Sequence, residues 1–181
     1  MSRERNHPLY RITVVCSGNI CRSPIAEIVL RRRLEEAGLG DTVQVDSAGT
    51  GAWHVGDQAD HRALAALTTG GYDGNSHRAR QFEPGWFEQT DLVLAADRGH
   101  ERQLRRLAGS EEDRAKVQLL RAFDPDAVAA GTLEVDDPYY GGPADFARTL
   151  SEVERAADGI VDHVRDAVTG PGGPAAGQPA R

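Results

Sequence analysis

The residues of this chain that are best suited to chemistry are a cysteine and an arginine six positions apart, Cys16 and Arg22. A β-branched run, Ile-Thr-Val-Val, precedes the cysteine and is typical of a buried parallel strand. Gly18 permits a tight turn, and Ser23 is a common N-cap, which predicts a helix directly after the arginine. Such a loop directs backbone N–H groups and the positive end of the helix dipole to one point. We therefore expect a cradle for an oxyanion such as phosphate.

The side chains of this cradle have separate expected roles. At its base, Cys16 is surrounded by groups that favour thiolate over thiol, which predicts a nucleophile. The guanidinium of Arg22 matches two oxygens of a phosphoryl group, and would bind the dianion and stabilise the group in transfer. We expect the Ser23 hydroxyl to donate to the thiolate and the Asn19 amide to hold the shape of the loop. The other residues of the phosphate loop are Ser17, Gly18 and Ile20.

A second informative stretch, from Asp136 to Tyr140, contains two acids, a proline and two tyrosines. Proline stiffens the backbone, and aromatic rings suit a loop that faces a substrate, which is the setting that a proton donor needs. Either Asp136 or Asp137 could be that donor, because geometry rather than residue type decides which acid reaches a leaving group.

Both stretches resemble one family. The cradle has the form Cys-x-Gly-Asn-x-Cys-Arg-Ser-Pro, which matches every fixed position in the signature of the bacterial low-molecular-weight protein tyrosine phosphatases. The second stretch resembles the Asp-Pro-Tyr loop of these enzymes, so the resemblance assigns the general acid to Asp137, directly before Pro138. It implies hydrolysis of phosphotyrosine through a phosphocysteine on Cys16, without a metal or a cofactor.

The resemblance also implies which residues bind the substrate. In this family, the loop after the second strand borders the cleft and its aromatic residue contacts the phosphotyrosine ring, a role that falls to Trp53. Tyr139 and Tyr140 would bind the substrate from the loop around Asp137, here called the acid loop, in a cleft too deep for phosphoserine. His54, next to the tryptophan, is expected to be a polar surface residue.

Three further residues have interpretations of their own. Cys21 lies within the cradle, where a reversible disulfide with Cys16 would protect the nucleophile from over-oxidation. The alternative for Cys21 is a small buried packing residue. His77 belongs to a charged segment that resembles a structural part of the family, and we interpret Asp97 as the N-cap of the helix that follows it.

The bulk composition limits the class of protein. The 181 residues are 39% hydrophobic and 27% charged, with a net charge of −7, as in one soluble domain that is not built for nucleic acid. No stretch is long and apolar enough for a membrane span, and no secretory signal begins the chain, so we expect a cytoplasmic protein. Two cysteines with no further ligands nearby suit neither a disulfide framework nor a zinc site. We expect a monomer.

The positioning elements alternate along the chain. The patterns predict strands near 10–15, 43–45, 91–97 and 117–120, and helices near 24–37, 59–68, 98–108 and 143–168. This alternation predicts a three-layer α/β sandwich: a four-stranded parallel sheet of order 2-1-3-4 with helices on both faces. The cradle would then lie at the topological switch point. We expect one domain over residues 9–168, a flexible N-terminus over 1–8 and a disordered Gly/Pro/Ala tail over 169–181.

Other functions remain open at this point. An arsenate reductase of the same fold would need an external small thiol, because no cysteine follows Cys21. Protein-arginine phosphatases of this fold carry a threonine at the position of Ile20, so the bulky apolar side chain favours phosphotyrosine. A non-enzymatic binding module would need neither a reactive cysteine nor a placed acid. The expected substrate is a tyrosine-phosphorylated protein, and the resemblance suggests a tyrosine kinase as a partner.

Overall fold

A computed structural model describes residues 9–171 of the chain. The strands are β1 (Tyr10–Cys16), β2 (Val43–Gly49), β3 (Leu92–Ala95) and β4 (Val117–Leu119). The helices are α1 (Arg22–Glu36), α2 (His61–Thr69), α3 (Arg98–Leu107), α4 (Glu111–Ala115), α5 (Pro125–Ala130) and α6 (Pro143–Thr169), with 3₁₀ helices η1 (Pro84–Gln89) and η2 (Leu120–Phe123). The expectations for residues 1–8 and 172–181 lie outside the described residues.

The four strands form one parallel sheet of order β2-β1-β3-β4, which confirms the predicted topology. β1 is central, and its register places Cys16 opposite Gly49 at the carboxyl end of β2. A central parallel strand is covered on both faces, which explains its uninterrupted β-branched run. The loop after β1 therefore begins where the order of the strands reverses, the usual place for a ligand in an open α/β sheet.

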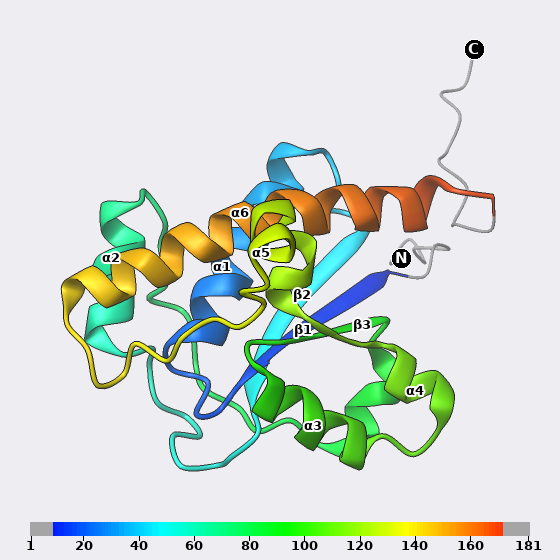
Figure 1. The fold of residues 1–181 in the computed structure, drawn as a ribbon, viewed down its shortest axis with the longest axis horizontal. Helices are drawn as coiled ribbons and strands as arrows, with labels where there is room; N and C mark the ends of the chain where they lie inside the picture. The colour runs from blue at the N-terminus through cyan, green and yellow to red at the C-terminus, as the bar shows by residue number, and fades with distance from the viewer. Residues whose placement is uncertain (1–8, 172–181) are drawn as a thin grey trace, which may run out of the picture.

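Two hydrophobic clusters hold the layers together. On one face, Ile12 and Val14 of β1 pack with the apolar sides of α1, α2 and α6. On the other face, Val15 packs with Leu104 of α3 and with Phe87 of η1. Figure 1 shows this arrangement, with α1, α2, α5 and α6 above the sheet and α3 and α4 below it. The layered burial holds the carboxyl ends of the strands in fixed positions.

Several boundaries differ from the sequence expectations. The N-cap of α1 is Cys21 rather than Ser23, and it makes no side-chain capping bond. The Ser23 prediction was wrong because this hydroxyl is used inside the phosphate loop. α6 continues to Thr169, one residue into the stretch that we expected to be a tail. The short helices α4, α5, η1 and η2 were not predicted, because one or two turns leave almost no periodicity to detect.

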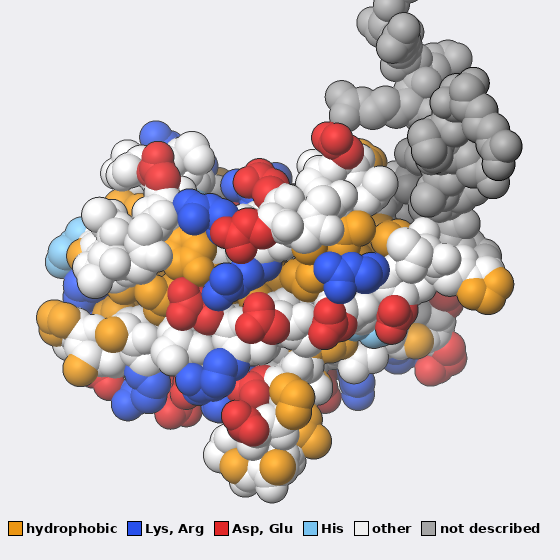
Figure 2. Space-filling view, turned by 90° about the horizontal axis from the view of Figure 1, so that it is seen from above, with side chains coloured by type: hydrophobic (Ala, Val, Ile, Leu, Met, Phe, Trp, Pro, Cys, Tyr) orange, Lys and Arg blue, Asp and Glu red, His pale blue; other side chains and the backbone are white. Residues whose placement is uncertain are grey.

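The surface over α6 is mixed in charge. Figure 2 shows this face from above, with acidic and basic side chains alternating over the helix and hydrophobic side chains between them. Positive charge is therefore not gathered into one patch on this face. Among residues 9–171, no helix is long and apolar enough to cross a membrane.

Candidate active site

The phosphate loop is shaped by Asn19 rather than by Gly18. Among the described residues, Asn19 is the one non-glycine with a left-handed backbone, at φ 58°. Its side-chain nitrogen donates to Ser23 Oγ at 2.8 Å and to Ser47 Oγ at 2.9 Å. Gly18 lies in the same turn with an ordinary φ, and a Cβ there would lie 2.9 Å from Cδ2 of His54. The glycine leaves room for a neighbouring side chain, and the asparagine makes the turn.

The same asparagine is held from outside the loop. Its backbone oxygen accepts from Nε2 of His77 at 2.7 Å, and its side-chain oxygen accepts from the backbone N–H of Arg80 at 2.9 Å. His77 is 8% exposed, so its role is structural, as we interpreted it. The strained backbone persists because these bonds from four directions over-determine it.

The Cys16 side chain lies at the base of the loop, 3% exposed, at the last position of β1. Its Sγ lies 2.9 Å from Ser23 Oγ. Because Asn19 already donates to that oxygen, the hydroxyl hydrogen of Ser23 is left for an acceptor. The acceptors within reach are the cysteine sulfur and, at 3.4 Å, the carbonyl of Ala48. Ser23 is thus placed to donate to a thiolate.

Arg22 is fixed by groups far away in the sequence. Its side chain is 4% exposed, and one terminal nitrogen donates to Asp97 Oδ2 at 2.8 Å and to the Val135 carbonyl at 2.9 Å. The other terminal nitrogen lies 3.6 Å from Asp137 Oδ2. Asp97 also caps α3, by accepting from the His100 backbone N–H at 3.1 Å. Our N-cap interpretation was correct, but it missed the contact with Arg22.

At Asp97, burial and the neighbouring groups have opposite effects on the pKa. Burial by itself disfavours the charged carboxylate, but the neighbouring His100 and Arg22 favour it more and hold the pKa of Asp97 below its usual value. The carboxylate therefore stays charged beside the buried guanidinium. Breaking such a pair leaves an uncompensated buried charge.

A buried histidine connects the two ends of the loop. His100 is 3% exposed, with Nε2 2.8 Å from Ser17 Oγ. Its Nδ1 lies 3.1 Å from Asp97 Oδ1, a contact without hydrogen-bond geometry. Burial lowers the pKa of His100 from 6.5 to about 4, so the ring is neutral near neutral pH. The contacts run from Ser17 through His100 and Asp97 to Arg22.

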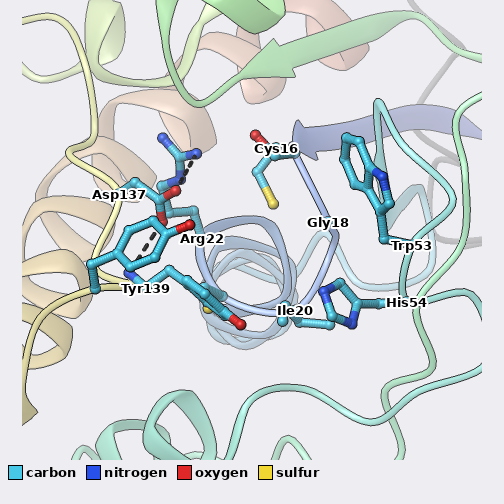
Figure 3. Close-up of a pocket in the computed structure, with 11 residues that line it drawn as sticks. Cys16, Gly18, Ile20, Arg22, Trp53, His54, Asp137 and Tyr139 are labelled. Atoms are coloured by element: carbon cyan, nitrogen blue, oxygen red, sulfur yellow. Dashed lines mark hydrogen bonds and ion pairs between the residues drawn. The ribbon is translucent and has the colours of Figure 1, made fainter.

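The predicted site residues meet around one cavity of about 140 Å³. Every one of them lines it except Asn19 and Ser23, which support the loop from behind. Figure 3 shows Cys16 between two walls, with Asp137 and Tyr139 on one side and Trp53 and His54 on the other. His54 is a surface residue as expected, with its side chain 35% exposed, and it also lines this cavity.

The aromatic residues of the walls differ in exposure. Tyr139 is 39% exposed, Trp53 is 74% exposed and Tyr140 is 92% exposed. The rings of Tyr139 and Tyr140 meet edge to face, with centroids 5.0 Å apart. Tyr139 is therefore the most enclosed of the three aromatic rings, while the other two form the open rim.

The two acids before Pro138 point to different places. Asp137 lines the cavity, and its Oδ1 accepts from the backbone N–H of Tyr139 at 3.2 Å. Asp136 does not line the cavity, and its charge instead helps to raise the pKa of Glu152, after the larger effect of burial. Of the two, only Asp137 faces the cysteine loop.

Cys21 lines the same cavity, and both cysteines are free thiols. Burial, followed by the nearby Asp60 and Cys16, raises the pKa of Cys21 to about 12. It is therefore protonated at neutral pH. Within residues 9–171, no cluster of three His, Cys, Asp or Glu side chains could hold a metal ion. The donors around the cavity suit an anion.

Sequence reasoning missed the residues that act behind the cavity. His100, Arg62 and the second contact of Asp97 carry no local pattern, since each reaches the site across a large separation in the chain. One signal was available for Asp97, because an acid at the carboxyl end of a parallel strand lies where ligands bind.

Comparison with known proteins agrees with this geometry. The family model described as low molecular weight phosphotyrosine protein phosphatase matches residues 11–169. A low molecular weight protein-tyrosine-phosphatase of Streptomyces coelicolor is 56% identical over 161 residues, which cover 89% of this chain and 97% of the relative. Low molecular weight protein-tyrosine phosphatase A of Mycobacterium tuberculosis is 46% identical over 159 residues, covering 87% and 92%.

The fold agrees as well. The crystal structure of a protein tyrosine phosphatase from Entamoeba histolytica superposes with a TM-score of 0.81 at 31% identity, covering 87% of this chain and 97% of that one. The sequence match, the order of the strands and the loop between Cys16 and Arg22 all indicate the same family. The chain belongs to the low molecular weight phosphotyrosine protein phosphatase family.

Proposed function

We propose that this protein hydrolyses phosphotyrosine in protein substrates, with Cys16 as nucleophile, Arg22 as phosphate ligand and Asp137 as general acid and base. The observation that carries this proposal is the cavity itself, which holds the cysteine at its base and an aspartate 3.6 Å from the loop arginine. The membership of the chain in a family of phosphotyrosine protein phosphatases supports the reaction class.

In the first step, the Cys16 thiolate attacks phosphorus, forming an S–P bond as the P–O bond to the tyrosine ring breaks. The loop N–H groups and the guanidinium of Arg22 hold the equatorial oxygens. Asp137 gives its proton to the departing phenolate oxygen. A hydrogen bond from Ser23, whose Oγ lies 2.9 Å from Sγ, stabilises the thiolate before attack.

In the second step, water attacks the phosphocysteine and gives a proton to the Asp137 carboxylate. The S–P bond breaks, inorganic phosphate leaves, and the thiolate of Cys16 is restored. Asn19 and Ser23 keep the loop in one shape through both steps, since their hydrogen bonds do not involve the substrate. The chemistry consumes water and needs no redox partner.

Side chains around the cavity support phosphotyrosine as the substrate. Tyr139 and Trp53 stand on opposite walls, where they would flank a phenyl ring (Figure 3). Ile20 adds an apolar surface to the same cavity. With the cysteine 3% exposed at the base, a long flat side chain reaches the sulfur more readily than a short phosphoserine.

Cys21 is proposed to protect the nucleophile. Peroxide would oxidise Cys16 to a sulfenic acid, and the Cys21 thiol would then form the disulfide with loss of water. The position of both cysteines at one cavity supports this role. We further propose a monomeric, cytoplasmic enzyme that works beside a tyrosine kinase, on the basis of the sequence reasoning above.

The test compares wild type with Cys16→Ser and Asp137→Asn on a phosphotyrosine peptide, without added metal. We expect turnover by wild type and none by Cys16→Ser. Asp137→Asn should lose roughly 100-fold or more in kcat/KM, together with the fall of kcat/KM at high pH that reports deprotonation of the acid. Phosphoserine, phosphoarginine and arsenate with a small thiol are parallel substrates. Turnover of phosphoarginine or arsenate in place of phosphotyrosine would show that the cradle is correct and the proposed substrate wrong.

A further inference from the structure

An arginine outside the cavity wall holds the backbone of the acid loop. One terminal nitrogen of Arg62 donates to the carbonyl of Tyr139 at 2.8 Å and to the carbonyl of Gly141 at 3.0 Å. Its guanidinium also lies over two aromatic rings, 4.7 Å from the centroid of Phe146 and 5.5 Å from that of Tyr139. These contacts flank the peptide that follows Asp137 and reach the first turn of α6.

The guanidinium is oriented by Asp60. The Nε of Arg62 donates to Asp60 Oδ1 at 3.0 Å, and its second terminal nitrogen donates to Oδ2 at 2.9 Å, a two-pronged pair. The same carboxylate caps α2 by accepting from the Arg62 backbone N–H at 2.9 Å. The hydrogen bonds from Arg62 lower the pKa of Asp60, so the pair stays charged over the neutral range. The pair with Asp60 uses Nε and one terminal nitrogen of the guanidinium, so the other terminal nitrogen is free to donate to the acid loop.

Asp60 also touches the phosphate loop. Its backbone N–H donates to the carbonyl of Ile20 at 2.9 Å. One short segment at the start of α2 is therefore bonded to the cysteine loop on one side and to the acid loop on the other. The two catalytic loops also touch each other where Arg22 donates to the Val135 carbonyl, 113 residues away in the chain. The start of α2 is a second direct link between them.

We infer that the Asp60–Arg62 pair is a positioning device that sets the place of Asp137 relative to the Cys16 loop, and that Arg62 acts on catalysis through the general acid. This inference rests on the proposed function. Arg62 itself does not line the cavity and touches no substrate. A lysine could replace it only in part, because a single ammonium group cannot bind Asp60 with two nitrogens and also donate to two carbonyls.

Leaving-group dependence tests this inference. Phenyl phosphate releases a basic phenolate that needs a proton, whereas dinitrophenyl phosphate releases a stable anion that does not. With phenyl phosphate, Arg62→Ala should lose at least about tenfold in kcat/KM, a part of the roughly 10²–10⁴-fold that a general acid contributes. With dinitrophenyl phosphate, the loss should stay below about threefold. Arg62→Lys should show the same pattern with a smaller loss.

A matched control exists in α1. Arg32 also donates to a backbone carbonyl, that of Gly71 at 2.9 Å, and its guanidinium lies 5.2 Å from the centroid of the Tyr72 ring. It makes a carbonyl contact and a ring contact like those of Arg62, but neither is with the acid loop. Arg32→Ala should therefore leave kcat/KM unchanged with both substrates. Inhibition by inorganic phosphate, measured on the Arg62 and Arg32 variants, should also be unchanged, because it reports anion binding by the Cys16 loop.

A double variant decides whether Arg62 acts through the acid. In the Asp137→Asn background, adding Arg62→Ala should cost less than about twofold with phenyl phosphate, because the group being positioned is already gone. The inference would be overturned if each Arg62 variant lost as much kcat/KM with dinitrophenyl phosphate as with phenyl phosphate. It would also be overturned if the losses from Arg62→Ala and Asp137→Asn were fully additive in the double variant. If Arg62→Ala does not fold, Arg62→Lys and its double variant carry the same decision. If Asp137→Asn loses the same fraction of kcat/KM with both aryl phosphates, Asp137 is not the general acid. That result would contradict the proposed function rather than the role of Arg62.

Discussion

Replacement of His100 by glutamine should change how the stability of the protein depends on pH. His100 is 3% exposed, and burial lowers its pKa from 6.5 to about 4. As the pH falls below 6.5, His100 becomes protonated in the unfolded chain while it stays neutral in the folded protein. The stability that the neutral ring contributes is therefore fully present above about pH 6.5 and is lost as the pH falls toward about 4.

The size of this loss follows from the two pKa values. The interval from 6.5 to about 4 corresponds to about 3 kcal/mol in all, of which about 2 kcal/mol is lost between pH 7 and pH 5. Glutamine does not titrate, so His100→Gln lacks this part of the acid dependence. Near neutral pH, the variant should be less stable by about 1–2 kcal/mol, because the 2.8 Å contact with Ser17 is disturbed.

Urea unfolding of wild type and His100→Gln at pH 7 and at pH 5 measures this difference. We expect the advantage of wild type to shrink by about 2 kcal/mol, so that the two proteins are nearly equally stable at the lower pH. His61→Gln is the control, since that side chain is 89% exposed and should show no such convergence. An advantage of wild type that stays constant within about 0.5 kcal/mol would refute the burial reasoning.

Two further predictions concern the phosphate loop. Gly49→Ala should destabilise the fold by about 1–3 kcal/mol and raise KM, because its Cβ would lie 2.6 Å from the Ser17 carbonyl oxygen. Chemical denaturation and steady-state kinetics check this against Gly85→Ala, whose Cβ would have no neighbour within 4 Å. Iodoacetamide at neutral pH should label Cys16 and spare Cys21, whose pKa near 12 keeps it a thiol. Peptide mass spectrometry reads the label, and preferential labelling of Cys21 would contradict the assignment.

Much of the fold was readable because its signals are local. A β-branched run that ends at Cys16, and apolar periodicity in the long helices, identified the main elements and therefore the parallel sheet. The start of α1 was misread, because a serine near a helix start serves equally well as a cap or as a partner of a buried sulfur. Residue type alone does not separate these uses, since both satisfy the hydroxyl.

The roles of charged residues were harder to predict. Asp97 was interpreted from its local capping position, and its bond to Arg22 across 75 residues was missed. His54 lies on the surface as expected, but its contact with Gly18 and its place in the cavity wall were missed. In both residues, the missed contact depends on how two strand-to-helix loops come together at one edge of the sheet.

The sequence by itself determined the cysteine cradle, because all of its chemistry lies between one strand end and the next helix start, where short-range geometry leaves few alternatives. Only the tertiary structure decided which partners the cradle has. Asp137 faces Arg22 while Asp136 does not, and Arg62 reaches the acid loop across 77 residues. The physical reason is that such contacts are set by the packing of whole helices and strands, and no residue type encodes which distant neighbour that packing will bring to it.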